Sequence, residues 1–298
     1  MAVLAVQHNR SGGSARPFQR LNITALFSVY NSVANSVLLQ TLTLLAQQPV
    51  AAQAAALRAA LGTAKVVHLR GLAAWQPAET WPAFYDALTE ATGQVLHLAE
   101  DFAQGSIRNG QKWIEVRYDA AIPDDAAYRF SKNAQPLHTD ESYLSAPAEV
   151  MFMHGLVQAP AGGETTFVDA DVLWQQLQAL APALAARLLG RPVRFAKAGD
   201  ARILPIIRPT PAGLRLNWNY HCVDPAESPE THALAQDFRQ FLLDHVSNTL
   251  AELAIQLAPG EAVAWWDDQV LHGRRAFRAT ATNDRFLLKS GFRLTTGA

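Results

Sequence analysis

Two histidines and one carboxylate are placed in this sequence so that they could bind one metal ion. His138 and Asp140 are separated by one residue, and side chains at positions i and i+2 of a strand point to the same side. His272 follows an apolar stretch and a polar turn in the segment WWDDQVLHGR. Two histidines and one carboxylate on one face of a metal suit iron(II) enzymes, because the opposite positions stay open for a co-substrate and oxygen. The pattern therefore predicts a metal site.

A second pair of residues could bind a carboxylate group. Arg285 opens the apolar stretch RFLLKSGF, and a guanidinium there can form a bidentate pair with a carboxylate. Thr165 follows a Gly-Gly turn and can donate a hydroxyl hydrogen bond to the same group. Arg285 and Thr165 support the prediction of a metal site. This support is needed because a His-x-acid pattern alone is expected about once by chance in a chain of this composition.

The composition is that of an ordinary folded protein. The chain has 298 residues, of which 49% are hydrophobic and 17% are charged, and its net charge is -1. These values argue against disorder and against an overall charge that attracts nucleic acid or an anionic membrane. The chain has one cysteine, Cys222, which excludes an intrachain disulfide and a cysteine-based zinc site. No apolar stretch suits a secretory signal or a membrane span, so we expect a cytoplasmic location.

The order of helical and strand patterns indicates an α+β fold. We expect a flexible arm over residues 1–20, followed by a single domain over 21–298 with a helical N-terminal part and helical insertions. Strands fill the middle and the end, which favours a mainly antiparallel sandwich or jelly roll with helices outside. Helices are expected over 21–48, 50–61, 79–93, 169–190 and 229–253. Strands are expected over 65–72, 113–119, 149–157, 164–169, 192–196, 203–208, 214–219, 261–267 and 285–294.

Four segments together resemble the taurine dioxygenase (TauD/TfdA-like) family of iron(II)- and 2-oxoglutarate-dependent oxygenases. The resemblance runs from about Lys65 to the end of the chain, and the segments occur in the family's order. Four segments in order are far more specific than any one of them. They are VVHLRGL, PLHTDESYLSAPAEV, APAGGETTFVDADVLWQQL and WWDDQVLHGRRAFRATATNDRFLLKSGFR.

The resemblance implies a fold, a set of cofactors and a reaction. It implies a double-stranded β-helix (jelly roll) core in which His138, Asp140 and His272 bind iron(II). Arg285 would pair with the distal carboxylate of 2-oxoglutarate, assisted by Thr165. The implied reaction consumes O2, converts 2-oxoglutarate to succinate and CO2, and oxidises a C–H bond of a small molecule.

The resemblance also has implications for the type of oxidation reaction and for the substrate. Related halogenases lack the ligand carboxylate, so Asp140 favours hydroxylation, while desaturation, cyclisation and epimerisation use the same ligands. In the resembling family a cation at the position of Lys289 can contact an anionic substrate group; the alternative is a solvated lysine. Further candidates for substrate contacts, each with a structural alternative, are Tyr143, Trp113, Arg117, Asn219 and Arg293. The substrate would be a small molecule, such as an amino acid or a natural-product intermediate.

Some charged and polar residues near these motifs are expected to be structural. His154 lies in the apolar stretch EVMFMHGLV and should be a hydrogen-bonded core histidine rather than a fourth ligand. Arg274 and Arg275 are expected to pair with Asp267 or Asp268. Arg293 is an alternative to Arg285 as the carboxylate-binding arginine.

Two other classes of function are consistent with parts of the pattern. A zinc-dependent hydrolase or isomerase could use the same three ligands, but it would leave Arg285 and Thr165 without a role. A non-catalytic jelly-roll binding protein would not need all three ligands. Neither nucleic acid nor membrane is expected as a partner, and the sequence leaves the oligomeric state open.

Overall fold

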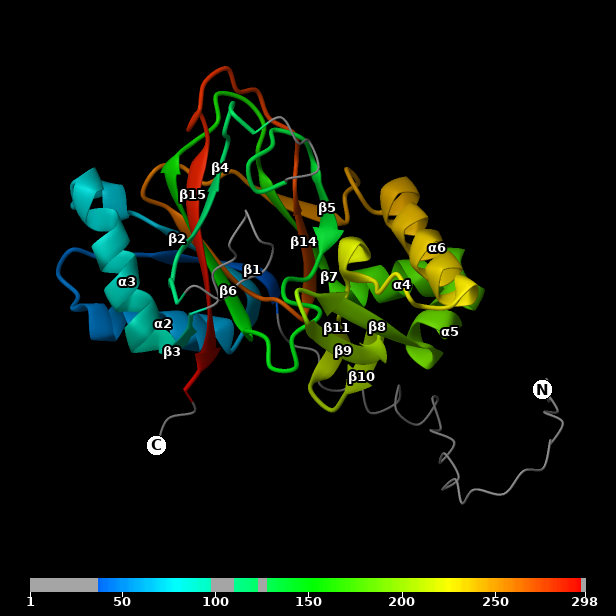
Figure 1. The fold of residues 1–298 in the computed structure, drawn as a ribbon. Helices are drawn as coiled ribbons and strands as arrows, with labels where there is room; N and C mark the ends of the chain where they lie inside the picture. Colours follow the sequence, from blue (N-terminus) through cyan, green and yellow to red (C-terminus); the bar gives the residue numbers. More distant parts are fainter. Residues whose placement is uncertain (1–36, 98–109, 123–127, 296–298) are drawn as a thin grey trace, which may run out of the picture. The chain divides into compact units, whose positions relative to one another are not determined.

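The computed structural model describes residues 37–97, 110–122 and 128–295. Residues 35–298 form one unit. The predicted arm over 1–20 and the predicted domain start at residue 21 lie outside the described residues. Figure 1 shows two sheets near the middle of the molecule, with helices on both sides.

The larger sheet carries seven strands. Their order is β1-β2-β13-β6-β15-β3, and β4 pairs with β15. Only the β1–β2 pair is parallel among these described pairs. The strands are β1 (Val37–Thr43), β2 (Ala64–Arg70), β3 (Gly93–Leu96), β4 (Ile114–Arg117), β6 (Val150–Val157), β13 (Ala262–Trp266) and β15 (Phe286–Leu294).

The smaller sheet carries four strands in the order β12-β7-β14-β5, and all its pairs are antiparallel. These strands are β12 (Glu252–Ile255), β7 (Thr165–Asp169), β14 (Val270–Arg274) and β5 (Gln135–His138). Apolar side chains from both sheets form one buried cluster, in which Met151, Trp265 and Leu287 of the larger sheet meet Phe167 and Val270 of the smaller. Two facing, mainly antiparallel sheets with helices outside confirm the predicted α+β jelly roll.

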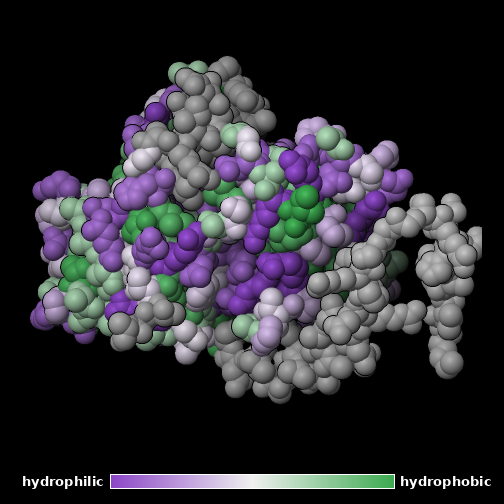
Figure 2. All heavy atoms as spheres, turned by 60° about the horizontal axis from the view of Figure 1, so that its bottom comes forward, coloured by the Kyte–Doolittle hydropathy of each residue, from purple (hydrophilic) through white to green (hydrophobic). Residues whose placement is uncertain are grey.

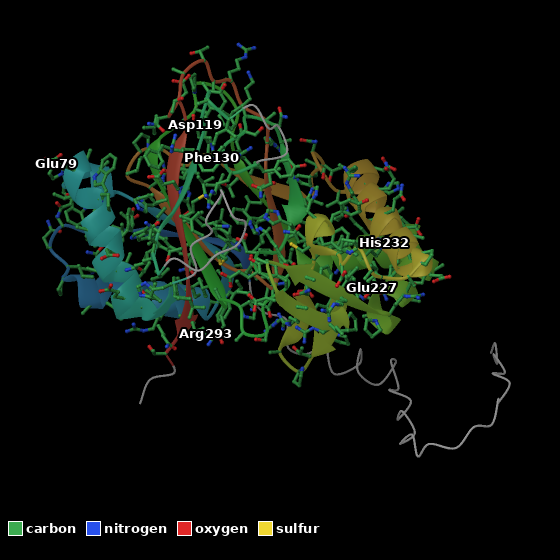
Figure 3. All side chains as sticks on the ribbon, in the orientation of Figure 1. Glu79, Asp119, Phe130, Glu227, His232 and Arg293 are labelled. Carbon is green, nitrogen blue, oxygen red and sulfur yellow. The ribbon has the colours of Figure 1, made fainter. Side chains whose placement is uncertain are left out.

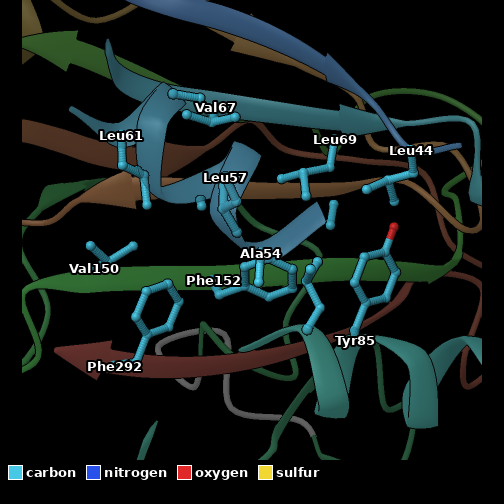
Figure 4. Close-up of a cluster of buried hydrophobic side chains, with 14 of the residues drawn as sticks. Leu44, Ala54, Leu57, Leu61, Val67, Leu69, Tyr85, Val150, Phe152 and Phe292 are labelled. Carbon is cyan, nitrogen blue, oxygen red and sulfur yellow. The ribbon is translucent and has the colours of Figure 1, made fainter. Parts of the chain in front are cut away.

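Helices α2 (Val50–Leu61) and α3 (Trp81–Thr92) cover the outer face of the larger sheet. Leu57 of α2 and Tyr85 of α3 are fully buried against Val67 and Phe152 of the sheet, as Figure 4 shows. Side chains on both faces of the central strand β6 are thus buried, as its continuous apolar pattern predicts. Short 3-10 turns at Leu72–Ala74 and Ala78–Thr80 connect β2 to α3.

A long insertion between β7 and β12 lies beside the smaller sheet (Figure 1). It contains three helices, two short hairpins and one 3-10 turn. These elements are α4 (Ala170–Leu180), α5 (Pro182–Gly190), β8 (Pro192–Lys197), β9 (Asp200–Pro205), β10 (Ile207–Thr210), β11 (Gly213–Leu216), η3 (Tyr220–Cys222) and α6 (Pro229–His245).

Three helix predictions are corrected by the structure. Residues 37–43 form strand β1, because they pair with β2, and that tertiary contact outweighs their helical pattern. The predicted helix 169–190 is divided at Pro182, which lacks an N–H and disfavours helical geometry in the residue before it. The predicted helix 229–253 ends at His245, and 252–255 form β12.

No helix in the described ranges is long and apolar enough to cross a membrane. Figure 2 shows hydrophilic and hydrophobic residues interspersed over the visible face.

Candidate active site

Antiparallel pairing of β5 and β14 brings the two predicted histidine ligands together. His138 is the last residue of β5 and is directly opposite His272 in the register. Their ring centroids are 4.2 Å apart. Asp140 lies in the turn after β5, next to Glu141, whose φ of 51° is unusual for a residue other than glycine. The carboxylate therefore reaches the histidines through a turn, and not through the i, i+2 strand geometry that the sequence suggested.

The three side chains have the spacing of ligands that share one ion. Nε2 of His272 lies 3.3 Å from Oδ2 of Asp140, and Nε2 of His138 lies 3.8 Å from Oδ1. One candidate ligand atom from each residue falls within 4.8 Å of the others. Because a metal–nitrogen or metal–oxygen bond is about 2.0–2.2 Å, such atoms can contact a single ion between them. Nδ1 of His138 donates to the Pro136 carbonyl at 2.9 Å, so the lone pair of this ring is on Nε2, which contacts the Gln135 amide nitrogen at 3.2 Å and could instead bind a metal.

Asp267 connects these ligands and was not predicted as a site residue. Its Oδ2 accepts a hydrogen bond from the backbone N–H of Asp140 at 2.8 Å. Its Oδ1 lies 3.3 Å from Nδ1 of His272 and accepts from Nε1 of Trp265 at 3.2 Å. One buried carboxylate thus accepts from the backbone of one predicted ligand and lies beside the ring of another. The sequence does contain a hint of this role. Metal-binding histidines usually have a partner for the second ring nitrogen, and Asp267 is an acidic residue shortly before His272.

The predicted partners of Arg274 and Arg275 are wrong. Arg274 is buried and donates to the backbone carbonyls of Tyr128 and Ser131, each at 2.8 Å. Arg275 pairs with Glu252 at 3.1 Å. Both aspartates are therefore available for other contacts.

Charge interactions in the site are strong because its two histidines are buried and Asp140 and Lys289 are largely buried. Burial alone would lower the pKa of His272, but the Asp140 and Asp267 carboxylates outweigh burial and raise that pKa to about 9. Burial and the neighbouring His272 lower the pKa of His138. Burial alone would raise the pKa of Asp140, but Lys289 and His272 hold it well below its ordinary value. Asp140 is therefore an ionised carboxylate, as a metal ligand must be.

Lys289 contacts Asp140 directly. Its Nζ donates to Oδ1 at 2.8 Å and to Oδ2 at 2.9 Å. The sequence suggested a contact with an anionic substrate group, but in this structure the ammonium is paired with a predicted metal ligand. Lys289 does line the same cavity.

Arg285 fits the predicted role of an anion-binding group. It is 4% exposed, and its Nε donates to the Gly163 carbonyl at 3.2 Å. Its buried Nη1 has no hydrogen-bond partner among the described residues. Gly163 has a φ of +81°, and a Cβ there would lie 3.0 Å from Nε of Arg285, so glycine is needed for this close approach. A buried guanidinium with an unused donor requires an anion, and a ligand carboxylate would supply one.

One cavity of about 450 Å³ contains both the candidate metal site and Arg285. This volume suits a small organic molecule beside a co-substrate. The described part of the chain lines it with six cationic and three acidic side chains, among many apolar ones. The predicted site residues on its wall are His138, Asp140, His272, Thr165, Arg285, Lys289, Tyr143 and Asn219.

Trp113 and Arg117 do not line this cavity. Nε1 of Trp113 donates to Asp86 of α3 at 3.1 Å, on the helix-covered side of the sheet. Arg117 pairs with Asp119 at 3.0 Å and with Glu115 at 2.9 Å. Two other residues of this segment, Ile114 and Val116, line the cavity instead. Because side chains alternate along a strand, the sequence interpretation chose residues of the wrong face.

Arg293 does not line the cavity either. It lies near the C-terminal end of β15, as Figure 3 shows, and donates to the backbone carbonyls of Ala146 and Pro147. It is therefore a structural residue and not an alternative to Arg285.

His154 is buried, as expected, but it is not hydrogen-bonded. Neither ring nitrogen has a partner within the described residues. The ring packs against Tyr85 at 4.8 Å and Trp113 at 5.1 Å between centroids. Burial lowers its pKa to about 3, so the ring is neutral at ordinary pH.

Comparison with known proteins agrees with this geometry. The family described as taurine catabolism dioxygenase TauD, TfdA family matches residues 40–290. The chain belongs to the TauD/TfdA family. It is therefore a non-haem oxygenase dependent on iron(II) and 2-oxoglutarate, with O2 as the oxidant. The matched range contains three of the four sequence motifs in full and the fourth as far as Ser290.

Solved structures share the fold of this TauD/TfdA chain at low identity. An asparagine oxygenase bound to Fe(II), hydroxyasparagine and succinate is 14% identical with a TM-score of 0.60, covering 83% of this chain and 79% of its own. PvcB from Pseudomonas aeruginosa is 22% identical with a TM-score of 0.58, covering 86% of each chain. OrfP, bound to a hydroxylated L-arginine, is 14% identical with a TM-score of 0.58, covering 85% and 94%. No curated protein sequence matches significantly.

Proposed function

We propose that this oxygenase hydroxylates a C–H bond of a small molecule, using His138, Asp140 and His272 as its iron ligands. In this proposal Arg285 binds the distal carboxylate of 2-oxoglutarate and Thr165 assists it. The observation that carries the proposal is the coexistence, in one cavity, of three converging ligand atoms and a buried guanidinium with an unused donor.

Each residue has a defined task in the proposed reaction. When bound, iron(II) and 2-oxoglutarate supply the oxidising chemistry, in which O2 is consumed, succinate and CO2 form, and one oxygen atom enters the substrate. The two histidines and Asp140 would hold the metal with three ligand atoms, a set that suits iron(II) enzymes which bind a co-substrate as well. Arg285 fixes the co-substrate by its far end, which orients the chelating end toward the metal. Asp267 keeps Asp140 and His272 in place.

Asp140 supports hydroxylation over halogenation. A carboxylate at this ligand position occupies the space that a halide would need. Desaturation, cyclisation and epimerisation need the same ligands, so the mass of the product distinguishes them from hydroxylation. A gain of one oxygen atom supports the proposal, and a loss of two hydrogen atoms contradicts it.

We further propose an amino acid or a natural-product intermediate as the substrate, and an anionic group on that molecule. Support comes from the hydroxylated amino acids bound in two structures of the same fold. The excess of cationic over acidic side chains on the described cavity wall supports the anionic group. A cytoplasmic location stays a prediction.

The proposal is tested by adding iron(II) and 2-oxoglutarate to the protein without oxygen. We expect a weak visible charge-transfer band that His272→Ala abolishes while the variant stays folded. With oxygen and a substrate library, succinate should form. A protein that gives no band, but hydrolyses a substrate with zinc, would instead be the metal-dependent hydrolase that the ligand set alone also allows.

A further inference from the structure

The cavity is closed on one side by the insertion between β7 and β12. This wall belongs to neither sheet, and none of its residues is a predicted metal ligand. Its side chains can therefore determine which substrate binds. Among the residues that the insertion contributes to the cavity wall are Lys197, Trp218, Tyr220, Arg239, Leu242 and Leu243.

Helix α6 presents one face to the cavity. Arg239, Leu242 and Leu243 are spaced at i, i+3 and i+4, which places them side by side on a helix. The guanidinium of Arg239 lies over the ring of Tyr220, 4.8 Å from its centroid. This contact holds the cation against the wall without neutralising its charge.

Arg239 has no acidic partner. Its Nε is buried, and within the described ranges the side chain forms no hydrogen bond and no ion pair. A guanidinium has five N–H donors, and burying the Nε–H without a partner is unfavourable. A group that accepts two of these donors, such as a carboxylate, would remove that cost.

The other five cations of the cavity wall each have contacts of their own or an assigned role. Lys289 is paired with Asp140, and Arg274 donates to backbone carbonyls. Arg285 is the residue assigned to the co-substrate. Lys197 lies over the ring of Tyr143, 5.8 Å from its centroid, and Arg129 lies over the ring of Phe130 at 4.8 Å. Both of these cations also have a further interaction partner. Arg239 is thus the cation on this wall that is best placed to receive a second anion.

Aromatic residues separate Arg239 from the metal site. Thr139, which stands between the first two predicted ligands, donates its N–H to the Trp218 carbonyl at 2.6 Å. The Trp218 ring packs against Tyr220 at 6.2 Å, and Tyr220 carries the Arg239 guanidinium. Arg239 thus connects to the metal ligands only through Tyr220 and Trp218, and an anion bound to it would lie at a different part of the cavity from the predicted ligands. Apolar side chains line the cavity as well, including Met151, Met153, Leu144 and Leu242.

We propose that Arg239 binds a carboxylate at the end of the substrate far from the oxidised carbon, with an apolar segment between the two. The inference rests on the proposed function, because it takes the metal site as the place of oxidation. It assigns substrate selection to the insertion and not to Lys289.

The probes for the test are hexanoate and octanoate with their uncharged amides. Their binding to the iron(II)/2-oxoglutarate complex is measured by calorimetry without oxygen. We expect the wild type to bind a carboxylate about tenfold more tightly than its amide, as a charge-assisted pair would give. Arg239→Gln should bring this ratio close to one, and Arg239→Lys should keep part of it. Arg208→Gln is the matched control, because Nε of Arg208 is also buried without a partner but lies outside the cavity.

Three outcomes overturn the inference. They are equal binding of acid and amide by the wild type, no binding of either, and a preference that survives in Arg239→Gln. A preference lost in Lys289→Gln but kept in Arg239→Gln would place the anion at Lys289. The charge-transfer band, measured in the same samples, tests the metal and co-substrate site separately. Arg239→Gln should leave this band and the thermal unfolding midpoint unchanged.

Discussion

Lys289 donates hydrogen bonds to both carboxylate oxygens of Asp140, at 2.8 and 2.9 Å. A residue of the large sheet thereby neutralises a predicted metal ligand that belongs to the turn after β5 in the small sheet. The pair is shielded from water, since both side chains are largely buried. The ammonium therefore acts on the same carboxylate that is proposed to bind iron.

Replacing Lys289 should strengthen metal binding. Two like charges a few ångströms apart in a partly buried site repel each other by several kcal/mol. We expect Lys289→Gln to bind iron(II) at least about tenfold more tightly, because the repulsion between the ammonium and the metal is removed. Lys289→Arg keeps the charge and is the control. Competition with a chromophoric chelator without oxygen measures the affinity, and weaker binding by the glutamine variant would show that Lys289 chiefly orients Asp140.

Asp267 should matter more for metal binding than its neighbour Asp268. Asp267 contacts the backbone of Asp140 and the ring of His272, whereas Asp268 pairs with Arg215 at 3.2 Å. We expect Asp267→Asn to lower the iron(II) affinity about 10–100-fold, as changes of such supporting residues do. Asp268→Asn should change it little. Similar affinities for the two variants would refute a positioning role for Asp267.

Arg285 should determine the affinity for 2-oxoglutarate without affecting the metal. Loss of a buried, charge-assisted contact costs about 2–5 kcal/mol, so Arg285→Gln should raise the 2-oxoglutarate concentration at half-saturation of the visible band by about 30-fold or more. Iron(II) affinity in the absence of 2-oxoglutarate should stay within about twofold. Arg275→Gln, at a site paired with Glu252, is the control. An unchanged half-saturation would mean that another residue binds the distal carboxylate.

His154 should make the fold sensitive to acid. Its pKa is lowered to about 3 by burial, against an ordinary value of 6.5. Below that ordinary value the unfolded chain binds a proton that the folded chain does not. The free energy of unfolding should therefore fall by about 1.4 kcal/mol per pH unit from this residue as the pH decreases from about 6.5 toward 3.

The test of this acid sensitivity compares urea unfolding at about pH 7 and about pH 5. His154→Phe should lose less stability between these pH values than the wild type, by about 2 kcal/mol. His232→Gln changes an exposed histidine of α6, labelled in Figure 3, and is the control. An equal acid dependence in His154→Phe and wild type would show that this buried ring does not contribute.

The sequence singled out the three candidate ligands because each lies inside a short motif whose order is characteristic, and the structure brings them together. It did not predict the contacts of Asp267, since an aspartate close to two arginines in sequence can pair with either. It also placed Trp113 and Arg117 in the substrate region. Alternation of side chains along a strand defines two faces but does not show which face lines the cavity. In this structure α3 covers the face that carries Trp113, so the opposite face lines the cavity.

The contribution of the insertion could not be predicted for a related reason. Arg239 lies on an amphipathic helix among other charged residues, and nothing local distinguishes it from them. Its place on the cavity wall results from how α6 packs beside Tyr220 and Trp218. Such tertiary contacts between distant segments are visible only in the folded chain.

The central claim is that His138, Asp140 and His272 bind iron while Arg285 binds 2-oxoglutarate. The most direct measurement is an anaerobic crystal structure with both cofactors, using anomalous scattering at the iron edge. We predict one iron peak within about 2.0–2.2 Å of a ligand atom from each of the three residues, with Arg285 on the distal carboxylate. A peak bound elsewhere, or an Arg285 turned away from 2-oxoglutarate, would contradict the claim.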